Sequence, residues 1–402
     1  MLVKKIPSDE LEIGMNVSSL DRPWSETPFL FAGFKIHKTS ELNDLQKYCK
    51  YVYVLTSHEE IEIHSLYGDN ETPDYCKFAG KAEYTISRSV EDEISIIEKD
   101  HEKIVELITD IEIISEKNGE LDFDEINNSI QILVQSITRN PDAFIWLTEI
   151  KIFDSYVYKD ALSCAIWATI LGRELGFAEN HLQSLAMGAL LMDIGKTALP
   201  KTLIHKSTKL SHDDWELMKT HVDHSLSIIK TMPNIPVEVI ELVMFHHERI
   251  DGSGYPDGLM GSQIPLFSQI AGVVDFYVSV TNSRPFAPAI SPSTAIEMLY
   301  HQQNKFFDET IIEAFIKALG TYPTGSLVEL STGDTGIVIA QNEAHKLRPQ
   351  ISLLLNAKRQ PYQSKIKINL LNETKDGNGH PLFVVKTLSD GAHGLKVKNL
   401  SI

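Results

Sequence analysis

Apolar stretches with helical spacing dominate the middle of this chain, whereas short alternating strands are expected at both ends. Residues 165–175 and 182–195 are apolar enough to form buried helices, and 215–229 carries an apolar stripe at helical spacing. Before position 66 and again after position 322, apolar residues come in short runs separated by turn residues. The pattern predicts a multidomain, mainly α protein, with a central all-α domain between two small β-rich units.

Turn-rich and polar segments predict where these units begin and end. We expect an N-terminal α+β module at 1–66, a linker with an acidic helical region at 67–141, a helical domain at 142–320 and a β-rich C-terminal unit at 321–402. The C-terminal unit opens with a hairpin signal around the turn STGDT. The predicted elements of the N-terminal module are strands at 3–6, 14–20, 29–36 and 51–55 and a helix at 42–49.

Isoleucine and valine recur at intervals of three and four after position 81, which predicts a long amphipathic helix. Residues 81–130 hold 15 acidic and five basic side chains, so more than half of the excess negative charge lies here. One interpretation is a connecting helix with a solvated face. The other is a helix that transmits signals or forms a homodimer through Ile94 and Ile97, and the stripe is compatible with both.

Charge and composition exclude several classes of protein. The net charge of −18 argues against nucleic-acid binding, which needs a basic face, but leaves a small anionic ligand open. No apolar run reaches the roughly 20 residues of a membrane span, and no secretory signal follows the first lysines. The three cysteines, Cys49, Cys76 and Cys164, fit neither a disulfide framework nor a CxxC site, so we expect a cytoplasmic protein.

Side chains that can bind a metal are concentrated in the predicted helical domain. Asp193 ends an apolar helix, His221 is expected in the middle of a helix, His246 and His247 are adjacent, and Asp275 follows an apolar run. Taken alone, a histidine on an apolar helix is more often a hydrogen-bonded core residue, and an aspartate at a helix end is more often a helix cap. Neighbouring histidines on a helix diverge by about 100°. Both can still reach one site if the helix ends there, as the following turn predicts. The joint occurrence favours a transition-metal site.

The segment HHERIDGSGYPDGLMGSQIP at 246–265 is similar to the motif HHExxDGxGYPxGLxGxxIP of the HD-GYP family of bacterial cyclic di-GMP phosphodiesterases. DIGKTALP at 193–200 also resembles a feature of that family. DRPWSETPFLFAGF at 21–34 resembles an N-terminal module that often precedes the domain. The resemblance implies an HD-fold helical domain with bound iron or manganese, and a cyclic dinucleotide that is opened to pGpG.

The resemblance also assigns roles to individual residues. Asp193 and Lys196 would be catalytic. The implied metal ligands are Asp160, Asp193, His221, His246, His247 and Asp275. The implied contacts to cyclic di-GMP are Lys196, Gly254, Tyr255, Pro256 and Arg284. Signalling proteins are the further partners that the resemblance implies.

The chain departs from the family pattern at its metal ligands. The HD doublet reads Met192-Asp193, and the histidine expected before it is Asp160. Thioether sulfur is a weak ligand for iron or manganese. The ligands of one metal are retained as Asp193, His221, His246 and His247. The ligands of a second metal would be reduced to Asp160, Asp193 and Asp275. Further family positions are replaced by Tyr156, Gln269 and Val278.

Two hypotheses follow for the activity. The clustered replacements favour a degenerate member that binds metal and a cyclic dinucleotide as a sensor or regulatory module. The retained GYP turn, Lys196 and Arg284 support the alternative, an active metal-dependent phosphodiesterase that hydrolyses cyclic di-GMP to pGpG or GMP. A helical scaffold that binds neither ligand nor metal is the third and least informative interpretation.

Overall fold

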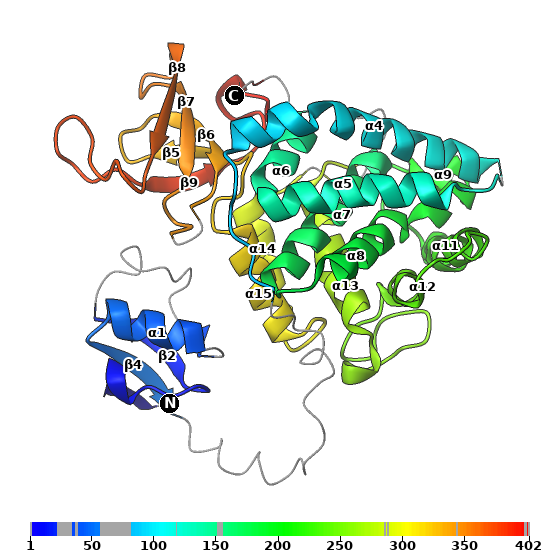
Figure 1. The fold of residues 1–402 in the computed structure, drawn as a ribbon, viewed down its shortest axis with the longest axis horizontal. Helices are drawn as coiled ribbons and strands as arrows, with labels where there is room; N and C mark the ends of the chain where they lie inside the picture. Colours follow the sequence, from blue (N-terminus) through cyan, green and yellow to red (C-terminus); the bar gives the residue numbers. More distant parts are fainter. Residues whose placement is uncertain are drawn as a thin grey trace.

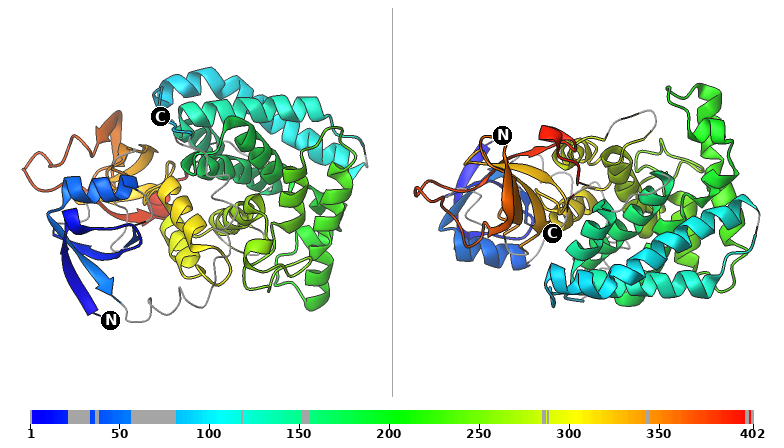
Figure 2. Two further views of the ribbon diagram at one scale, coloured as in Figure 1. Left: turned by 60° about the horizontal axis from the view of Figure 1, so that its bottom comes forward. Right: turned by 90° about the horizontal axis from the view of Figure 1, so that it is seen from above.

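Three regions are distinct in the computed structural model of the protein (Figure 1). The N-terminal module is blue, the helical body runs from cyan to yellow, and the C-terminal sheet is orange and red. Figure 2 shows from two further directions that the module and the sheet lie on the same side of the helical body. The residues described are 2–21, 34–36, 39–56, 82–117, 119–150, 156–284, 287, 289–342, 345–397 and 400.

The N-terminal module is a four-stranded antiparallel sheet with one helix packed on it. The strand order is β1 (Leu2–Pro7), β4 (Tyr51–Thr56), β2 (Asn16–Leu20) and β3 (Phe34–Lys35), and α1 spans Thr39–Tyr48. Its small core includes Ile36, Leu45 and Val52, all fully buried. The predicted helix and the strands at 3–6, 14–20 and 51–55 are confirmed. Most of the predicted strand at 29–36, and most of the aromatic-rich segment 21–34, lies outside the described residues.

The long acidic helix is α4 (Val90–Glu116), and it packs with α5 (Phe123–Arg139) on the helical body. The side chains of Ile97, Ile104, Ile108 and Ile111 are all buried in the same hydrophobic cluster as the central helices. The isoleucine stripe therefore packs against the helices of its own chain. Its burial gives no support to the predicted homodimer. The predicted linker at 68–80 lies outside the described residues.

The central body is all-α, as predicted, and its main layer is formed by α7 packed between α8 and α13. Trp167, Leu171, Ile270 and Phe315 belong to its core. Gly172 permits the close approach of α7 and α8, since a Cβ there would lie 2.7 Å from a methyl of Leu182. The helices are α6 (Pro141–Ile150), α7 (Tyr156–Glu174), α8 (Glu179–Leu191), α9 (Lys201–Ile204), α10 (His212–Lys219), α11 (His221–Ile229), α12 (Val237–Phe245), α13 (Leu266–Thr281), α14 (Pro292–Tyr300) and α15 (Glu309–Leu319).

The stretch 215–229, which carries the predicted apolar stripe, is helical but is divided at Thr220 into α10 and α11. The hydroxyl of Thr220 donates to the carbonyl of Leu217 at 2.7 Å, and its backbone N–H bonds to the same carbonyl at 3.2 Å. These local bonds end α10 at Lys219, so that Thr220 alone separates it from His221. His221 therefore stands at the first residue of α11 and not in the middle of a helix, which is a correction.

The C-terminal unit is a five-stranded antiparallel sheet, which confirms the β-rich prediction. Its strand order is β8 (Pro361–Asn369), β7 (Gln350–Leu355), β6 (Thr335–Ala340), β5 (Leu327–Leu330) and β9 (Val384–Leu388). β5 and β6 form the predicted hairpin. The edge strand β9 did not stand out in the sequence, because its side chains from Val385 to Leu388 are at least partly exposed.

Buried contacts fix the sheet to the helical body. Trp146 of α6 packs in one cluster with Ile337 and Ile339 of β6. Asp142 of α6 accepts hydrogen bonds from the hydroxyl of Thr324 at 2.6 Å and from the backbone N–H of Gln341 at 2.9 Å. None of the helices among the described residues combines the length and the apolar character that crossing a bilayer requires.

Candidate metal centre

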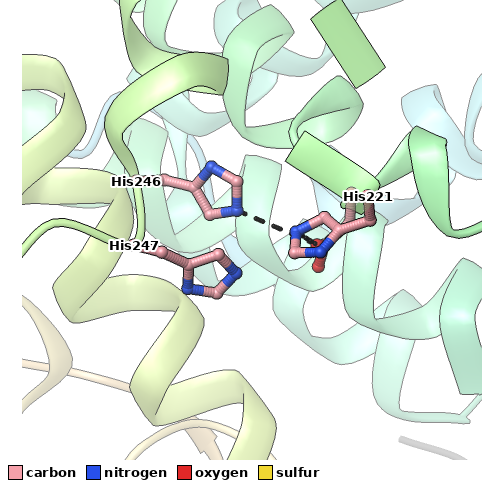
Figure 3. A group of neighbouring side chains, drawn as sticks. His221, His246 and His247 are labelled. Carbon is pink, nitrogen blue, oxygen red and sulfur yellow. Dashed lines mark ion pairs between the residues drawn. The ribbon is translucent and has the colours of Figure 1, made fainter. Parts of the chain in front are cut away.

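Four side chains meet at one end of the helical body. Asp193, His221, His246 and His247 each place one ligand-type atom so that all four atoms lie within 4.8 Å of one another. Figure 3 shows the three imidazoles facing a common space. Asp193 follows the end of α8, His221 begins α11, and the His pair follows the end of α12. The structure therefore assembles the ligands that sequence assigned to the first metal.

Backbone carbonyls orient two of the imidazoles. Nδ1 of His221 lies 2.7 Å from the carbonyl oxygen of Met218, and Nδ1 of His246 lies 2.8 Å from that of Val243. Because a carbonyl only accepts, Nδ1 carries a proton in both rings, and Nε2 is the ring nitrogen that faces Asp193. The Nε2 atoms lie 3.2 Å and 3.9 Å from Oδ1 of that carboxylate.

The inward-facing atoms of this cluster lack ordinary hydrogen-bond partners. Oδ1 of Asp193 and Nε2 of His221 and of His246 are buried without a hydrogen bond among the described residues. Buried polar atoms are rarely left in that state, and three of them around one point need an explanation. A shared divalent cation accounts for all three, since carboxylate oxygen and imidazole nitrogen are the ligands that such a cation takes.

The local fold holds Asp193 against His221 by close backbone packing. Gly195 lies where a Cβ would come within 2.1 Å of the His221 carbonyl oxygen, so no larger residue fits there. The hydroxyl of Ser225 donates to the carbonyl of Met192 at 2.8 Å and accepts from the N–H of Gly195 at 2.8 Å. Ser225 was not singled out in the sequence, because a contact across 33 residues leaves no local pattern.

The electrostatics of the cluster keep its groups in the protonation states that bind metal. Burial by itself raises the pKa of Asp193, but Lys196, whose Nζ lies 2.7 Å from Oδ2, holds that pKa well below its ordinary value. Burial lowers the pKa of His246 to about 4. Burial and the neighbouring histidines also hold the pKa of His247 well below its ordinary value. Asp193 is therefore ionised and both imidazoles are neutral near neutral pH.

The GYP turn is anchored by a buried carboxylate. Glu248, only 4% exposed, accepts hydrogen bonds from the backbone N–H groups of Asp257, Gly258 and Leu259 at 2.7–3.0 Å. Gly254 allows the turn to fold back, since a Cβ there would lie 2.4 Å from the Arg249 nitrogen. Glu248 received no role from the sequence, although it belongs to the quoted motif.

The turn brings an aromatic side chain onto the cluster. The ring of Tyr255 stacks on the imidazole of His247, with centroids 4.7 Å apart and planes inclined by 26°. The ammonium of Lys219 lies 5.6 Å from the centroid of the tyrosine ring, and Trp215 meets the ring edge-on at 6.3 Å. Pro256, the next residue of the turn, is exposed. An aromatic and a cationic group thus lie beside the metal-type ligands.

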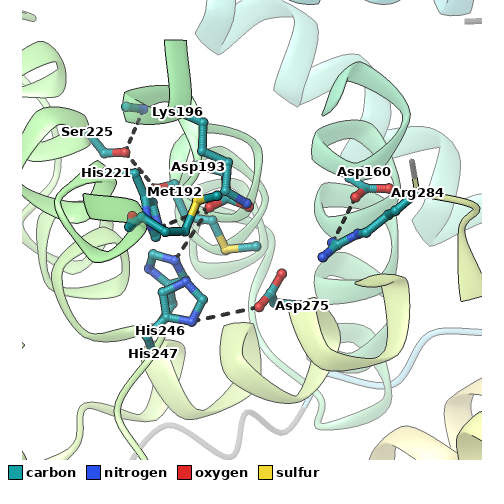
Figure 4. A network of polar contacts seen from close by, with 12 residues as sticks. Asp160, Met192, Asp193, Lys196, His221, Ser225, His246, His247, Asp275 and Arg284 are labelled. Carbon is teal, nitrogen blue, oxygen red and sulfur yellow. Dashed lines mark hydrogen bonds and ion pairs between the residues drawn. The ribbon is translucent and has the colours of Figure 1, made fainter. Parts of the chain in front are cut away.

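The side chains expected to complete a second metal site are arranged differently. Oδ2 of Asp275 lies 3.9 Å from Nδ1 of His247, so Asp275 borders the four-residue group without belonging to it. Asp160 accepts a hydrogen bond at Oδ1 from Asn282 at 2.7 Å and another at Oδ2 from Arg284 at 3.0 Å (Figure 4). Met192 is buried. These residues do not fit a second metal, because the charge of Asp160 is already paired with Arg284 and Met192 offers only a thioether.

Comparison with known proteins agrees with the architecture of the whole chain. Residues 140–311 match the HD domain, residues 3–116 a domain of unknown function (DUF3391), and residues 327–391 a KOW domain associated with HD domain. The central helices are therefore those of an HD-domain protein.

Individual relatives indicate which kind of HD-domain protein the chain is similar to. The cyclic di-GMP phosphodiesterase PA4108 of Pseudomonas aeruginosa is 26% identical over 371 residues, covering 89% of this chain and 86% of that protein. The cyclic di-GMP phosphodiesterase response regulator RpfG of Xanthomonas campestris is 34% identical over 151 residues, covering 37% of this chain and 40% of that protein. A solved HDG"Y"P protein, Bd1817 from Bdellovibrio bacteriovorus, is 17% identical with a TM-score of 0.47, covering 78% of this chain and 98% of that one. The HD-domain match, the GYP turn and these relatives show that the chain is similar to proteins of the HD-GYP family.

Proposed function

We propose that this protein binds one divalent metal and a cyclic dinucleotide, with cyclic di-GMP as the first ligand to test, and acts as a sensor and not as a hydrolase. The observation that supports metal binding is the cluster of Asp193, His221, His246 and His247. Buried inward atoms of the first three make no hydrogen bond to any described residue. These four residues would hold iron or manganese. When bound, such an ion supplies positive charge to phosphate oxygens and acidifies water.

The surroundings of the cluster suit an anionic nucleotide. Lys196 already pairs with Asp193, so its charge is fixed beside the ligands. Tyr255 and Lys219 contribute an aromatic face and a second cation next to His247. Aromatic rings stack with bases, and cations pair with phosphates. The overall charge of −18 does not oppose this, because much of the excess lies in the region of α4.

A sensor is favoured over a hydrolase because the second metal's ligands are not assembled. A two-metal hydrolysis clamps the attacking and the leaving oxygens between two ions. Here Met192 stands in place of an imidazole, and Asp160 is bonded to Asn282 and Arg284. A single metal beside the GYP turn would still offer positive charge to a phosphate of the ligand.

Hydrolysis of cyclic di-GMP is the second candidate, and one contact favours it. Asp275 lies beside His247 and could contribute an oxygen to a second ion with little movement. The relative PA4108, which aligns over most of both chains, is named a phosphodiesterase.

Metal content and nucleotide turnover separate the two candidates. The full chain is purified anaerobically with iron and with manganese, and metals per chain are counted. Binding of cyclic di-GMP and of a mixed cyclic dinucleotide is measured by calorimetry, and pGpG is followed by chromatography. We expect one metal, tight binding and no product. Two metals with turnover that disappears in His246→Ala would overturn the sensor proposal, and no nucleotide binding by metal-loaded protein would reject both candidates.

A further inference from the structure

Resting on the single metal of the proposed function, we infer that Arg284, anchored by Asp160, takes the place of a second metal ion in this pocket. The guanidinium of Arg284 supplies the positive charge on the side of the pocket away from the histidines. Asp160 and Arg284 thereby form a fixed ion pair, in which Asp160 positions the guanidinium, and not part of a metal site.

The contacts of Asp160 carry this inference. The carboxylate is 8% exposed, and its two oxygens receive one hydrogen bond each, from Nδ2 of Asn282 and from Nη2 of Arg284. A metal bound to Asp160 would share the carboxylate with both donors and would be repelled by the Arg284 guanidinium, whose Nη2 lies 3.0 Å from Oδ2. It would gain only a thioether from Met192 in return, which is a poor ligand for iron or manganese. Breaking a buried ion pair also leaves an uncompensated charge, which is strongly unfavourable.

The backbone after α13 holds both donors in position. The N–H of Asn282 bonds to the carbonyl of Val278 at 3.0 Å and ends the helix. The N–H of Arg284 bonds to the carbonyl of Ala287 at 2.9 Å, and Ala287 returns a bond to Arg284 at 3.1 Å. Asn282 and Arg284 therefore reach Asp160 from one short segment, across more than 120 residues of sequence.

Arg284 also lies in the field of the other carboxylates. Burial opposes its charge, but Asp160, Asp275 and Asp193 together raise the pKa of the guanidinium. Figure 4 shows its guanidinium end on the side that faces Asp275. Two of these three carboxylates are already paired with a cationic side chain, Asp193 with Lys196 and Asp160 with Arg284. The charge that a second divalent ion would supply is therefore largely present.

The chemistry of the guanidinium explains binding without turnover. Arg284 is protonated at any physiological pH, so it attracts a phosphate, but it cannot acidify a water as a metal does. Its Nε is buried and makes no hydrogen bond to any described residue. That N–H remains for a phosphate oxygen of the ligand.

Manganese titration of the nucleotide-free full chain tests the inference. Bound Mn²⁺ is counted by electron paramagnetic resonance and calorimetry in wild type, Arg284→Gln and Arg359→Gln. Arg359 is the matched control, because its Nη2 pairs with Glu329 at 2.7 Å in the C-terminal sheet. We expect one ion in wild type and in Arg359→Gln, and a second, weaker ion in Arg284→Gln, where Asp160 has lost its cation. Two ions in wild type, or a single ion in folded Arg284→Gln, would overturn the inference.

Asp160→Asn gives an independent answer if Arg284→Gln does not fold. The asparagine keeps the shape and one acceptor for Asn282 or Arg284, so we expect one ion bound with unchanged affinity. A loss of bound manganese, or an affinity more than tenfold weaker, would show that Asp160 is a metal ligand and would overturn the inference. These titrations contain no nucleotide. Failure to bind cyclic di-GMP would therefore reject the proposed function while the ion count still decides this inference.

Discussion

The two sides of the candidate site use similar side chains but differ in what their polar atoms contact. On the side of α11 and α12, Asp193, His221 and His246 direct buried atoms at one another, and these atoms make no hydrogen bond to any described residue. On the side of α7 and the end of α13, the oxygens of Asp160 are bonded to Asn282 and Arg284. The buried polar atoms of the first side need a bound cation as a partner, whereas on the second side Arg284 already supplies the cation.

This difference shows that the hydrogen-bond partners of a carboxylate, and not its presence alone, define a metal ligand. Leaving buried donors and acceptors unpaired costs free energy, so the histidine side is stabilised by whatever ion binds there. Pairing Asp160 with Arg284 removes that cost in advance. Substitutions on the histidine side should therefore change metal binding most.

The largest effect is expected from His221→Ala. It removes a ligand whose Nε2 faces the cluster, so metal affinity should fall at least about 100-fold. The measurement is manganese titration by calorimetry. His224→Ala is the matched control, because His224 lies in the same helix with its side chain exposed and should bind as wild type. A change of less than threefold in His221→Ala would contradict the four-ligand site.

Gly195→Ala should disturb the same side without changing a ligand. The new methyl would lie 2.1 Å from the His221 carbonyl and 2.3 Å from the Ser225 nitrogen, so α11 must move away from Asp193. We expect a loss of about 3 kcal/mol in the free energy of unfolding, together with weaker metal binding. Urea denaturation measures the first. Gly377→Ala, where nothing lies within 4 Å of the added Cβ, should be neutral. Equal stability of the two variants would show that the contact can relax.

Glu248→Gln should loosen the GYP turn and leave the metal ligands in place. The amide keeps one acceptor for three N–H groups, so we expect a loss of about 2 kcal/mol in unfolding free energy. Hydrogen exchange at Asp257, Gly258 and Leu259 should become faster, while the manganese count is unchanged. Glu297→Gln, on an exposed position of α14, is the control. Unchanged exchange at these three amides would show that other contacts hold the turn.

Much of the fold could be predicted because its signals are local. The apolar period of α7 and α8, the hairpin of β5 and β6, and the helix end before the His pair all follow from neighbouring residues. The break at Thr220 was missed because its hydroxyl replaces a helical bond without altering the apolar stripe. Strand β9 was missed because it pairs with β5 across more than 50 residues and buries little of its own surface.

The candidate site could be predicted only where it depends on residue type. The Asp193 and histidine set is recognisable because those residues keep the family's ligand types. Asp160 occupies a ligand position in the motif, yet its partners Asn282 and Arg284 come from a distant segment. Sequence position alone assigned Asp160 to the metal and Arg284 to the nucleotide. The structure joins the two, and no local pattern could have shown that pairing.

The smallest effect is a pH dependence confined to the histidine side, measured on metal-free protein with a chelator present. Burial lowers the pKa of His246 from its ordinary value of 6.5 to about 4, so between these values the unfolded chain binds the extra proton and the folded chain does not. Stability should therefore be level above pH 6.5 and should fall by about 1 kcal/mol for each pH unit as the pH drops towards 4. His246→Gln should reduce this slope in urea denaturation, with His247 contributing the remainder, whereas His224→Gln should keep the wild-type slope. If His246→Gln keeps the wild-type slope, His246 is protonated in the folded, metal-free protein. In that case metal binding itself would have to remove the proton and produce the neutral imidazole that the metal site needs.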